Sequence, residues 1–192
     1  VVTSDPGHTA ITIANTSSSP TNITLADVIH NSLGPVTIST AHGDIINGAG
    51  GRIEAATLAM SAVAGAIGSS SSPIRTQTTR IDATAQNGIW ISETGDLETG
   101  AIASTGNSVN LTATGSILDA DPGVVINVRG PALNLSAGTG SIGLSGHALR
   151  IDASVAAGAL NASALTGINA IDLSAGLGIG TVTSATGAIA LA

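Results

Sequence analysis

Two carboxylates stand close together in the run Asp119-Ala120-Asp121-Pro122-Gly123. A pair of carboxylates is what a polysaccharide-cleaving enzyme uses as acid and base, and an oxygen-rich turn can also hold calcium. The Pro-Gly step instead indicates a turn whose Asp side chains accept hydrogen bonds from nearby backbone amides. We therefore expect a capped turn here and no catalytic residue, and a polysaccharide-active β-helix enzyme is the least favoured alternative.

Histidine and serine offer the other candidate chemistry, at His8, His30, His42, Ser145 and His147. The four histidines lie in separate parts of the chain, and no two have the short spacing that is typical of zinc ligands. Ser145 and His147 belong to no nucleophile elbow and have no acidic neighbour that would complete a triad. The expectation is that the chain holds no metal, no cofactor and no catalytic site.

Trp90 is the only aromatic residue, since Phe and Tyr are absent. If Ile89 and Ile91 face the interior of a strand-built core, the period of two places Trp90 on the outside. An exposed indole could stack on a sugar or anchor a contact with a surface molecule of a host or neighbouring cell. Trp90 is therefore the one surface-contact residue that the sequence predicts.

Charged residues are few, with 12 Asp and Glu, five Arg, no Lys and a net charge of −7. Without a basic cluster or several aromatic residues, the chain is not expected to bind nucleic acid. Two Arg-Ile-Asp steps, at 80–82 and 150–152, place opposite charges on one strand face as weak ion pairs. The remaining arginines, Arg52, Arg75 and Arg129, are scattered.

Two short polar motifs recur and carry no clear function. Asn-x-Ser/Thr occurs at Asn15, Asn22, Asn110, Asn134 and Asn161, which is expected by chance in a chain so rich in Ser and Thr. Thr-x-Thr, which ice-binding solenoids present as a regular array, occurs at Thr76, Thr112 and Thr181 but not once per repeat.

Small residues dominate the composition, because Ala, Gly, Thr and Ser make up 102 of the 192 positions. The absence of Cys excludes disulfides and thiolate metal sites. The longest weakly polar stretch, residues 55–67, is too short and too interrupted to span a bilayer. Large side chains that would fill a conventional compact core are almost missing.

A motif of alternating apolar residues followed by Gly-x-Ile repeats along the chain. Its copies start near residues 11, 36, 58, 81, 109, 133, 151, 171 and 189, with a mean spacing near 22 residues. Within each copy the apolar period is two, which is the pattern of a strand, and Gly and Pro mark turns between copies. Such short units bury a continuous core only when they stack.

The prediction is an all-β fold, a single-stranded parallel β-helix (β-solenoid) of about nine rungs, forming one domain over residues 1–192 with the repeat clearest from residue 34. At a rung spacing of about 4.8 Å, the rod would be about 43 Å long. An Ala-rich helix at 54–67 and a β-sandwich are the competing folds.

The repeats resemble those of filamentous-haemagglutinin-type adhesins, over most of the chain from about Gly34 onward. The run that carries the likeness includes Leu58-Ala59-Met60-Ser61-Ala62, Gly65-Ala66-Ile67-Gly68, Pro73-Ile74-Arg75-Thr76, Ile81-Asp82-Ala83, Gly88-Ile89-Trp90-Ile91 and Gly95-Asp96-Leu97. The resemblance implies a right-handed coil, a secreted or outer-membrane-associated location in a Gram-negative bacterium, and an adhesive or spacer role. The family's Asn-Pro-Asn-Gly secretion motif is missing, with only Asn87-Gly88-Ile89 as a fragment, which favours a shaft segment.

We therefore expect a non-catalytic structural shaft of a secreted or cell-surface bacterial adhesin, with cell-surface molecules or glycans as partners. No polar cap helix is evident before the first strand or after the last run, 187–192, and an uncapped solenoid rung is an edge onto which further strands can pair. We therefore expect the chain to be either an excerpt of a longer array or a subunit that stacks end to end. The second case gives the alternative function, a self-assembling extracellular filament or matrix subunit.

Overall fold

The computed structural model describes residues 2–3, 9–121, 126–153, 159–174 and 176–192. Within these ranges the regular structure is strand only, and the helix considered at 54–67 is absent: Arg52–Ala62 is a strand. No helix among the described residues is long and apolar enough to cross a membrane. The nineteen strands are β1 (Val2–Thr3), β2 (Ile11–Asn15), β3 (Ile23–Leu25), β4 (Val28–Thr40), β5 (Ile45–Asn47), β6 (Arg52–Ala62), β7 (Ile74–Ala85), β8 (Ile89–Glu93), β9 (Leu97–Ser104), β10 (Val109–Ala113), β11 (Ile117–Asp119), β12 (Val128–Arg129), β13 (Leu133–Ala137), β14 (Ser141–Ile142), β15 (Leu149–Asp152), β16 (Ala159–Ala164), β17 (Gly167–Asp172), β18 (Gly178–Ser184) and β19 (Ile189–Leu191).

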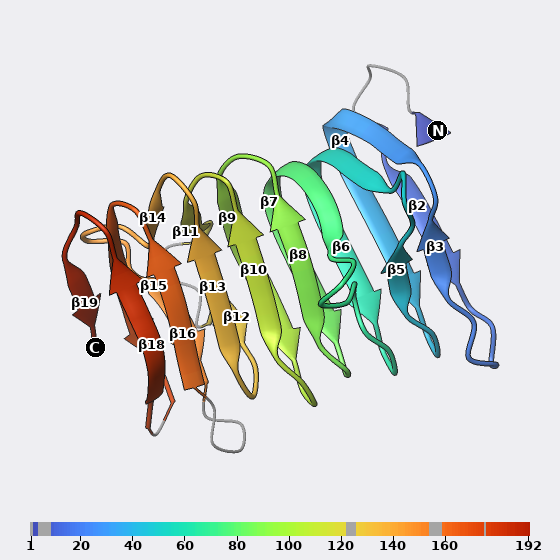
Figure 1. Ribbon diagram of the computed structural model, residues 1–192. Coiled ribbons are helices and arrows are strands. Elements are labelled where there is room, and N and C mark those ends of the chain that lie inside the picture. The colour runs from blue at the N-terminus through green and yellow to red at the C-terminus, as the bar shows by residue number, and fades with distance from the viewer. Residues whose placement is uncertain (1, 4–8, 122–125, 154–158, 175) are drawn as a thin grey trace.

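The strands stack as successive turns of a β-solenoid of about eight turns, each about 22 residues after the last. The pairings between the named strands are parallel, as in β4 with β6 and β10 with β13. Figure 1 shows the turns following one another along one axis, from β2 and β3 near the N-terminus to β18 and β19 near the C-terminus. The predicted parallel β-solenoid is confirmed, with about eight turns where the motif count gave about nine.

The core is a column of stacked aliphatic side chains inside the coil. Ile45, Ile67 and Ile89 lie in register in successive turns, and each is fully buried. Along a strand the buried positions alternate with less buried ones, as in β8 and β13, because successive side chains point to opposite faces. The described core is therefore built mainly from Ile, Leu, Val and Ala.

Acidic side chains cap the corners between the strands. The carboxylate of Asp44 accepts a hydrogen bond from the backbone amide of Ala66 in the next turn, at 2.8 Å. Asp96 does the same for the amide of Ser116, at 2.7 Å. At a corner the regular ladder is interrupted, so a backbone amide there needs a side-chain acceptor. Several of the few acids are thus used for structure.

The motif alignment predicted the register correctly within two groups of turns and failed at the other steps. Residues 11, 36, 58 and 81 lie in register as expected, and so do 109 and 133. The step from 81 to 109 is wrong, because Ile81 pairs with Thr99 and Val109 pairs with Ile89. The step from 133 to 151 is wrong too, because Leu133 pairs with residue 160. The last starts, 151, 171 and 189, are out of register because residue 150 pairs with 171 and residue 168 pairs with 189. The same motif recurs on different sides of the coil, and the strand pattern is alike on each of them.

Glu93 is an ionisable side chain that points into the coil. It is 1% exposed, and its carboxylate accepts hydrogen bonds from the amide and the hydroxyl of Thr78, at 2.9 and 3.0 Å. Burial, which disfavours the charged form, raises the pKa of Glu93 above its usual value. The interior therefore holds a carboxyl whose ionisation opposes folding.

Replacement of Glu93 by Gln is expected to raise the free energy of unfolding at neutral pH and to flatten its pH dependence. Because its pKa is raised in the folded chain, the stability that Glu93 contributes is fully present below about pH 4.5, the usual value, and is lost as the pH rises through the folded pKa. Gln keeps an acceptor for the Thr78 amide and carries no charge. Urea unfolding of both proteins at acidic and neutral pH measures the difference. Glu98→Gln removes the same charge from an outward-facing position, and equal pH dependence in the wild type and Glu93→Gln would contradict the prediction.

Candidate functional site

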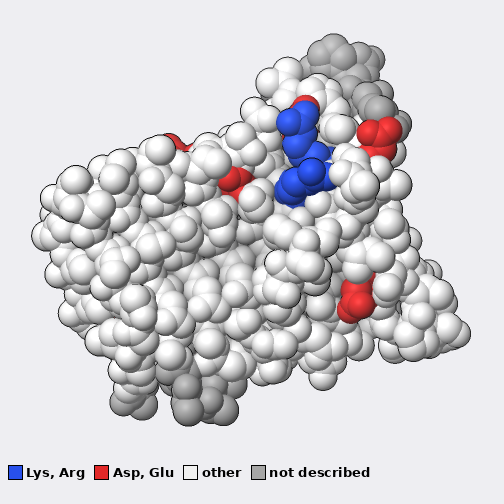
Figure 2. All heavy atoms as spheres, viewed as in Figure 1, with Lys and Arg blue, Asp and Glu red and all other residues white. Residues whose placement is uncertain are grey.

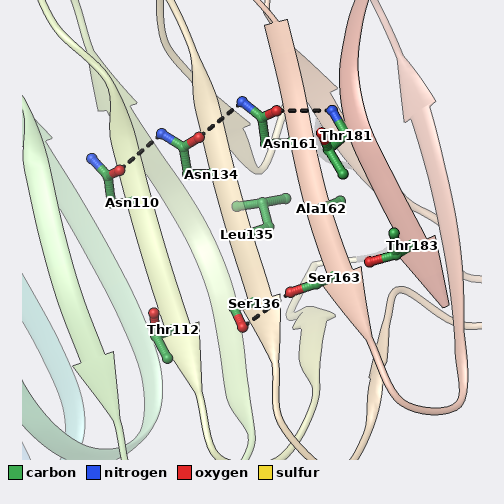
Figure 3. Close-up of a pocket in the computed structure, with 10 residues that line it drawn as sticks. All are labelled: Asn110, Thr112, Asn134, Leu135, Ser136, Asn161, Ala162, Ser163, Thr181 and Thr183. Atoms are coloured by element: carbon green, nitrogen blue, oxygen red, sulfur yellow. Dashed lines mark hydrogen bonds between the residues drawn. The ribbon is translucent and has the colours of Figure 1, made fainter. Parts of the chain in front are cut away.

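One side of the solenoid, here called the front face, is formed by β8, β10, β13, β16 and β18. Its exposed side chains are mostly neutral and polar, apart from Trp90 on β8 and Ile179 on β18. The polar ones form two parallel rows across the turns (Figure 3). The rows arise because Asn and Ser or Thr stand two residues apart on each strand and so share a face. One row holds Asn110, Asn134, Asn161 and Thr181, and the other holds Thr112, Ser136, Ser163 and Thr183.

The first row is a ladder of hydrogen-bonded amides. The side-chain amide of Asn134 donates to the carbonyl of Asn110 at 2.8 Å, and that of Asn161 donates to Asn134 at 3.0 Å. The backbone amide of Thr181 continues the ladder to the carbonyl of Asn161 at 2.9 Å. Each side-chain amide carries two donor hydrogens, so Asn134 and Asn161 each keep one for a ligand.

A shallow hollow of about 330 Å³ lies between the two rows. Its floor includes Leu135 and Ala162, and its walls are the amides and hydroxyls of the rows. The pairing of β16 with β18 shifts register between Leu160 and Ala162, which interrupts the regular surface at one side of the hollow. Figure 2 shows that most of this side of the molecule carries no charged residue.

Trp90 lies at the start of the amide row, because it is in register with Asn110. Ile89 and Ile91 are buried, as the alternation predicted, and the half-buried ring of Trp90 lies on the outside. A Cβ on Gly88 would come within 2.6 Å of the ring, so the glycine gives the indole space to lie flat against the backbone. The predicted outward position of Trp90 is confirmed, and its role in a contact stays a prediction.

The chemistry available to the front face is hydrogen bonding and stacking. None of the described residues that line the hollow is Asp, Glu, His, Lys or Arg, so these residues supply no group that could act as acid or base at neutral pH. Amides, hydroxyls and one aromatic ring are the groups that recognise hydroxyl-rich molecules.

The amide ladder is the feature that sequence reasoning missed. Three of the five Asn-x-Ser/Thr motifs, at Asn110, Asn134 and Asn161, lie in adjacent turns and form the rows. The sequence signal that could have revealed the ladder is that each of these Asn residues stands between two inward-facing residues of its strand, so that all three point outward. Of the Thr-x-Thr motifs, Thr181 and Thr183 continue both rows, whereas Thr76 points inward and is fully buried.

Asp119 and Asp121 are held in structural hydrogen bonds and ion pairs, and residues 122 and 123 of the predicted motif lie outside the described residues. Asp119 accepts a hydrogen bond from the backbone amide of Asp121 at 2.9 Å and from the side chain of Asn127 at 2.7 Å. Its other oxygen pairs with Arg150 at 2.6 Å, and Arg80 pairs with Asp121 at 2.6 Å. The hydrogen bond from Arg80 holds the pKa of Asp121 below its usual value. The expected capping of a backbone amide is confirmed for Asp119, and the two arginines were not expected there.

The two predicted ion pairs within a strand have different outcomes. Arg80 and Asp82 form the expected pair at 3.0 Å. Asp152 pairs instead with Arg129 of the preceding turn, at 3.1 Å, while the guanidinium of Arg150 is turned towards Asp119. Neighbouring turns supply partners that sequence spacing does not show.

The candidate histidines lie apart from one another. His30 pairs with Glu54, His42 and His147 are exposed in turns beside separate strands, and His8 lies outside the described residues. Ser145 is exposed in the turn closed by Leu144 and His147. Among the residues that the structure describes, no group of three or more His, Asp or Glu could hold a metal ion.

Comparison with protein-family models, with curated proteins and with solved structures gave no match to this chain. The likeness to filamentous-haemagglutinin repeats therefore stays a prediction from the residues.

Proposed function

We propose that this chain is a non-catalytic shaft segment of a secreted or cell-surface bacterial adhesin. The observation that supports it best is the stacking of about eight turns on one aliphatic core. Each turn hydrogen-bonds to the next along the axis, so the molecule is extended and resists bending, as a spacer must. The resemblance to adhesin shafts supports the same role, and the neutral front face with Trp90 is the surface we propose for contact.

The proposed mechanism is geometric. Each turn adds about 4.8 Å of length, so a solenoid gains reach in proportion to its turns. Hydroxyl and amide side chains keep the outside hydrated without the charge repulsion that a highly charged rod would experience. Such a shaft would carry a binding region away from the cell or offer its own shallow face.

Replacement of Trp90 by Ala is expected to reduce adhesion by the front face, because the indole is the largest apolar group on it. The measurement is attachment of beads coated with the purified chain to cells and to immobilised glycans. Val63→Ala, which removes an exposed apolar side chain elsewhere, is the matched control. Attachment that Trp90→Ala leaves unchanged would contradict the contact role, and no attachment by the wild type would leave only the spacer role.

The surface location needs its own test. Antibodies raised against the chain should label intact cells of the producing bacterium, and labelling only after permeabilisation would contradict the proposal. Electron microscopy over a range of concentrations separates the shaft from the alternative filament. Single rods of about 4 nm, from eight turns of about 4.8 Å, support the shaft, whereas long fibres support end-to-end assembly.

A further inference from the structure

Arg75 differs from the other arginines in its partners. Four arginines pair with carboxylates, namely Arg52 with Glu54, Arg80 with Asp82 and Asp121, Arg129 with Asp152, and Arg150 with Asp119. Arg75 instead donates hydrogen bonds to two backbone carbonyls, and no carboxylate among the described residues pairs with it. Within the described part of the chain its positive charge therefore has no anionic partner, and it is available to an anion from solution.

The guanidinium of Arg75 is held in place rather than free in solution. Its Nε donates to the carbonyl of Gly51 at 3.0 Å, and one Nη donates to the carbonyl of Ala49 at 2.7 Å. A guanidinium has five N–H donors in a rigid plane, so three remain for a ligand. Fixing the side chain in advance removes much of the entropy cost of binding.

Two adjoining hollows meet at Arg75. One, of about 440 Å³, is lined by Val28, Ala49, Gly50, Arg52, Ser92 and Thr94 besides Arg75. The other, of about 290 Å³, is lined by Asn47, Ser72 and Ser92. Among the described residues, neither hollow has a carboxylate in its lining. Basic side chains gather in one patch on the side seen in Figure 2, and acidic side chains lie beside this patch.

We propose that Arg75 and the hollows around it bind the carboxylate or sulfate group of an acidic saccharide. The guanidinium plane matches the two oxygens of such a group, and Ser92 and Thr94 offer hydroxyls beside it. This inference goes beyond the shaft role, because a spacer needs no ligand.

The surroundings of Arg75 favour a saccharide as the carrier of the anion. Ser92 is in register with Arg75 on the neighbouring strand and stands two residues after Trp90, so Ser92 and Trp90 share one face of β8. A saccharide chain bound at Arg75 can therefore extend past the indole towards the amide row, where neutral donors and acceptors suit its hydroxyl groups. Nucleic acid would need several cations along its backbone, and this patch has one arginine without a carboxylate partner.

The test is calorimetric titration of the purified chain with an oligogalacturonate and with the same oligosaccharide after its carboxylates are reduced to alcohols. The acidic form is expected to bind the wild type at least about tenfold more tightly than the neutral form. Arg75→Gln should bind the acidic and neutral forms with equal affinity. Arg75→Lys should keep only part of the preference for the acidic form, since lysine keeps the charge and loses the planar guanidinium. Arg129→Gln removes the same charge from a side chain that is 54% exposed and should bind as the wild type does.

Equal binding of the acidic and neutral forms to the wild type would overturn the proposal without any variant, even if a variant fails to fold. The proposal would also be overturned if folded Arg75→Gln bound the acidic oligosaccharide as tightly as the wild type does. Inorganic sulfate distinguishes a bare anion site from a saccharide site: sulfate that binds as tightly as the oligogalacturonate contradicts the saccharide part. Because the readout is ligand affinity, failure here leaves cell-surface labelling and rod length, the tests of the shaft, unaffected.

Discussion

Replacement of Arg150 by Met is expected to lower the free energy of unfolding by about 3–5 kcal/mol. The side chain of Asp119 is only 2% exposed, and Arg150 is the cation that pairs with it. Without Arg150 the carboxylate stays buried with only neutral donors, Asn127 and the amide of Asp121. Urea unfolding followed by circular dichroism, with the fluorescence of Trp90 as a second probe, measures the loss.

The matched control is Arg52→Met. Arg52 also pairs with a carboxylate, Glu54, but its side chain is 44% exposed, so water screens the pair and the expected loss is under about 1 kcal/mol. The double variant Asp119→Asn/Arg150→Met removes the charge and keeps an acceptor for Asn127. It should be more stable than Arg150→Met alone. If Arg150→Met and Arg52→Met lowered the free energy of unfolding equally, the burial of Asp119 would not be what makes the loss of Arg150 destabilising.

Replacement of Gly65 by Ala is expected to cost about 3 kcal/mol or more, because the added methyl group has no space. Gly65 is buried at a corner of the coil, and a Cβ there would lie well under 3.0 Å from the carbonyl oxygen of Gly43 in the preceding turn. Since that oxygen belongs to the backbone, the clash can be relieved only if the two turns move apart. The movement would disturb the stacking of Ile45 on Ile67 beside the corner.

Gly176→Ala is the control for Gly65→Ala, and thermal unfolding compares the two. A Cβ on Gly176 would have no neighbour within 4 Å, so this variant should match the wild type or gain up to about 1 kcal/mol from the lower entropy of its unfolded chain. An unfolding temperature of Gly65→Ala as high as that of Gly176→Ala would contradict the close approach of the turns at this corner.

The fold class could be predicted because its causes are local. The period of two, as in Leu133 to Ala137, defines a strand with one buried face, and Gly and Pro define the turns. The absence of large side chains indicates a narrow core. The outward position of Trp90 follows from the same alternation. These conclusions need no knowledge of which turn lies beside which.

The pairing between distant turns could not be predicted so well. The motif that starts at Ile81 resembles the one that starts at Val109, yet the two lie on different sides of the coil. A strand on any side of the solenoid has aliphatic residues inward and small polar residues outward, so similarity of pattern does not fix register. The amide row through Asn134 was missed for this reason, since it exists only once the register is known.

The sequence by itself thus determined the all-β solenoid, its repeat length, its aliphatic interior and its low surface charge, because each depends on residue type and on spacing within one turn. The tertiary structure alone decided the pairing of Arg150 with Asp119, the burial of Glu93, the amide ladder and the backbone carbonyls that hold Arg75. Each of these depends on which residues of neighbouring turns come into contact, and the competition among similar strands is resolved only when the whole coil packs.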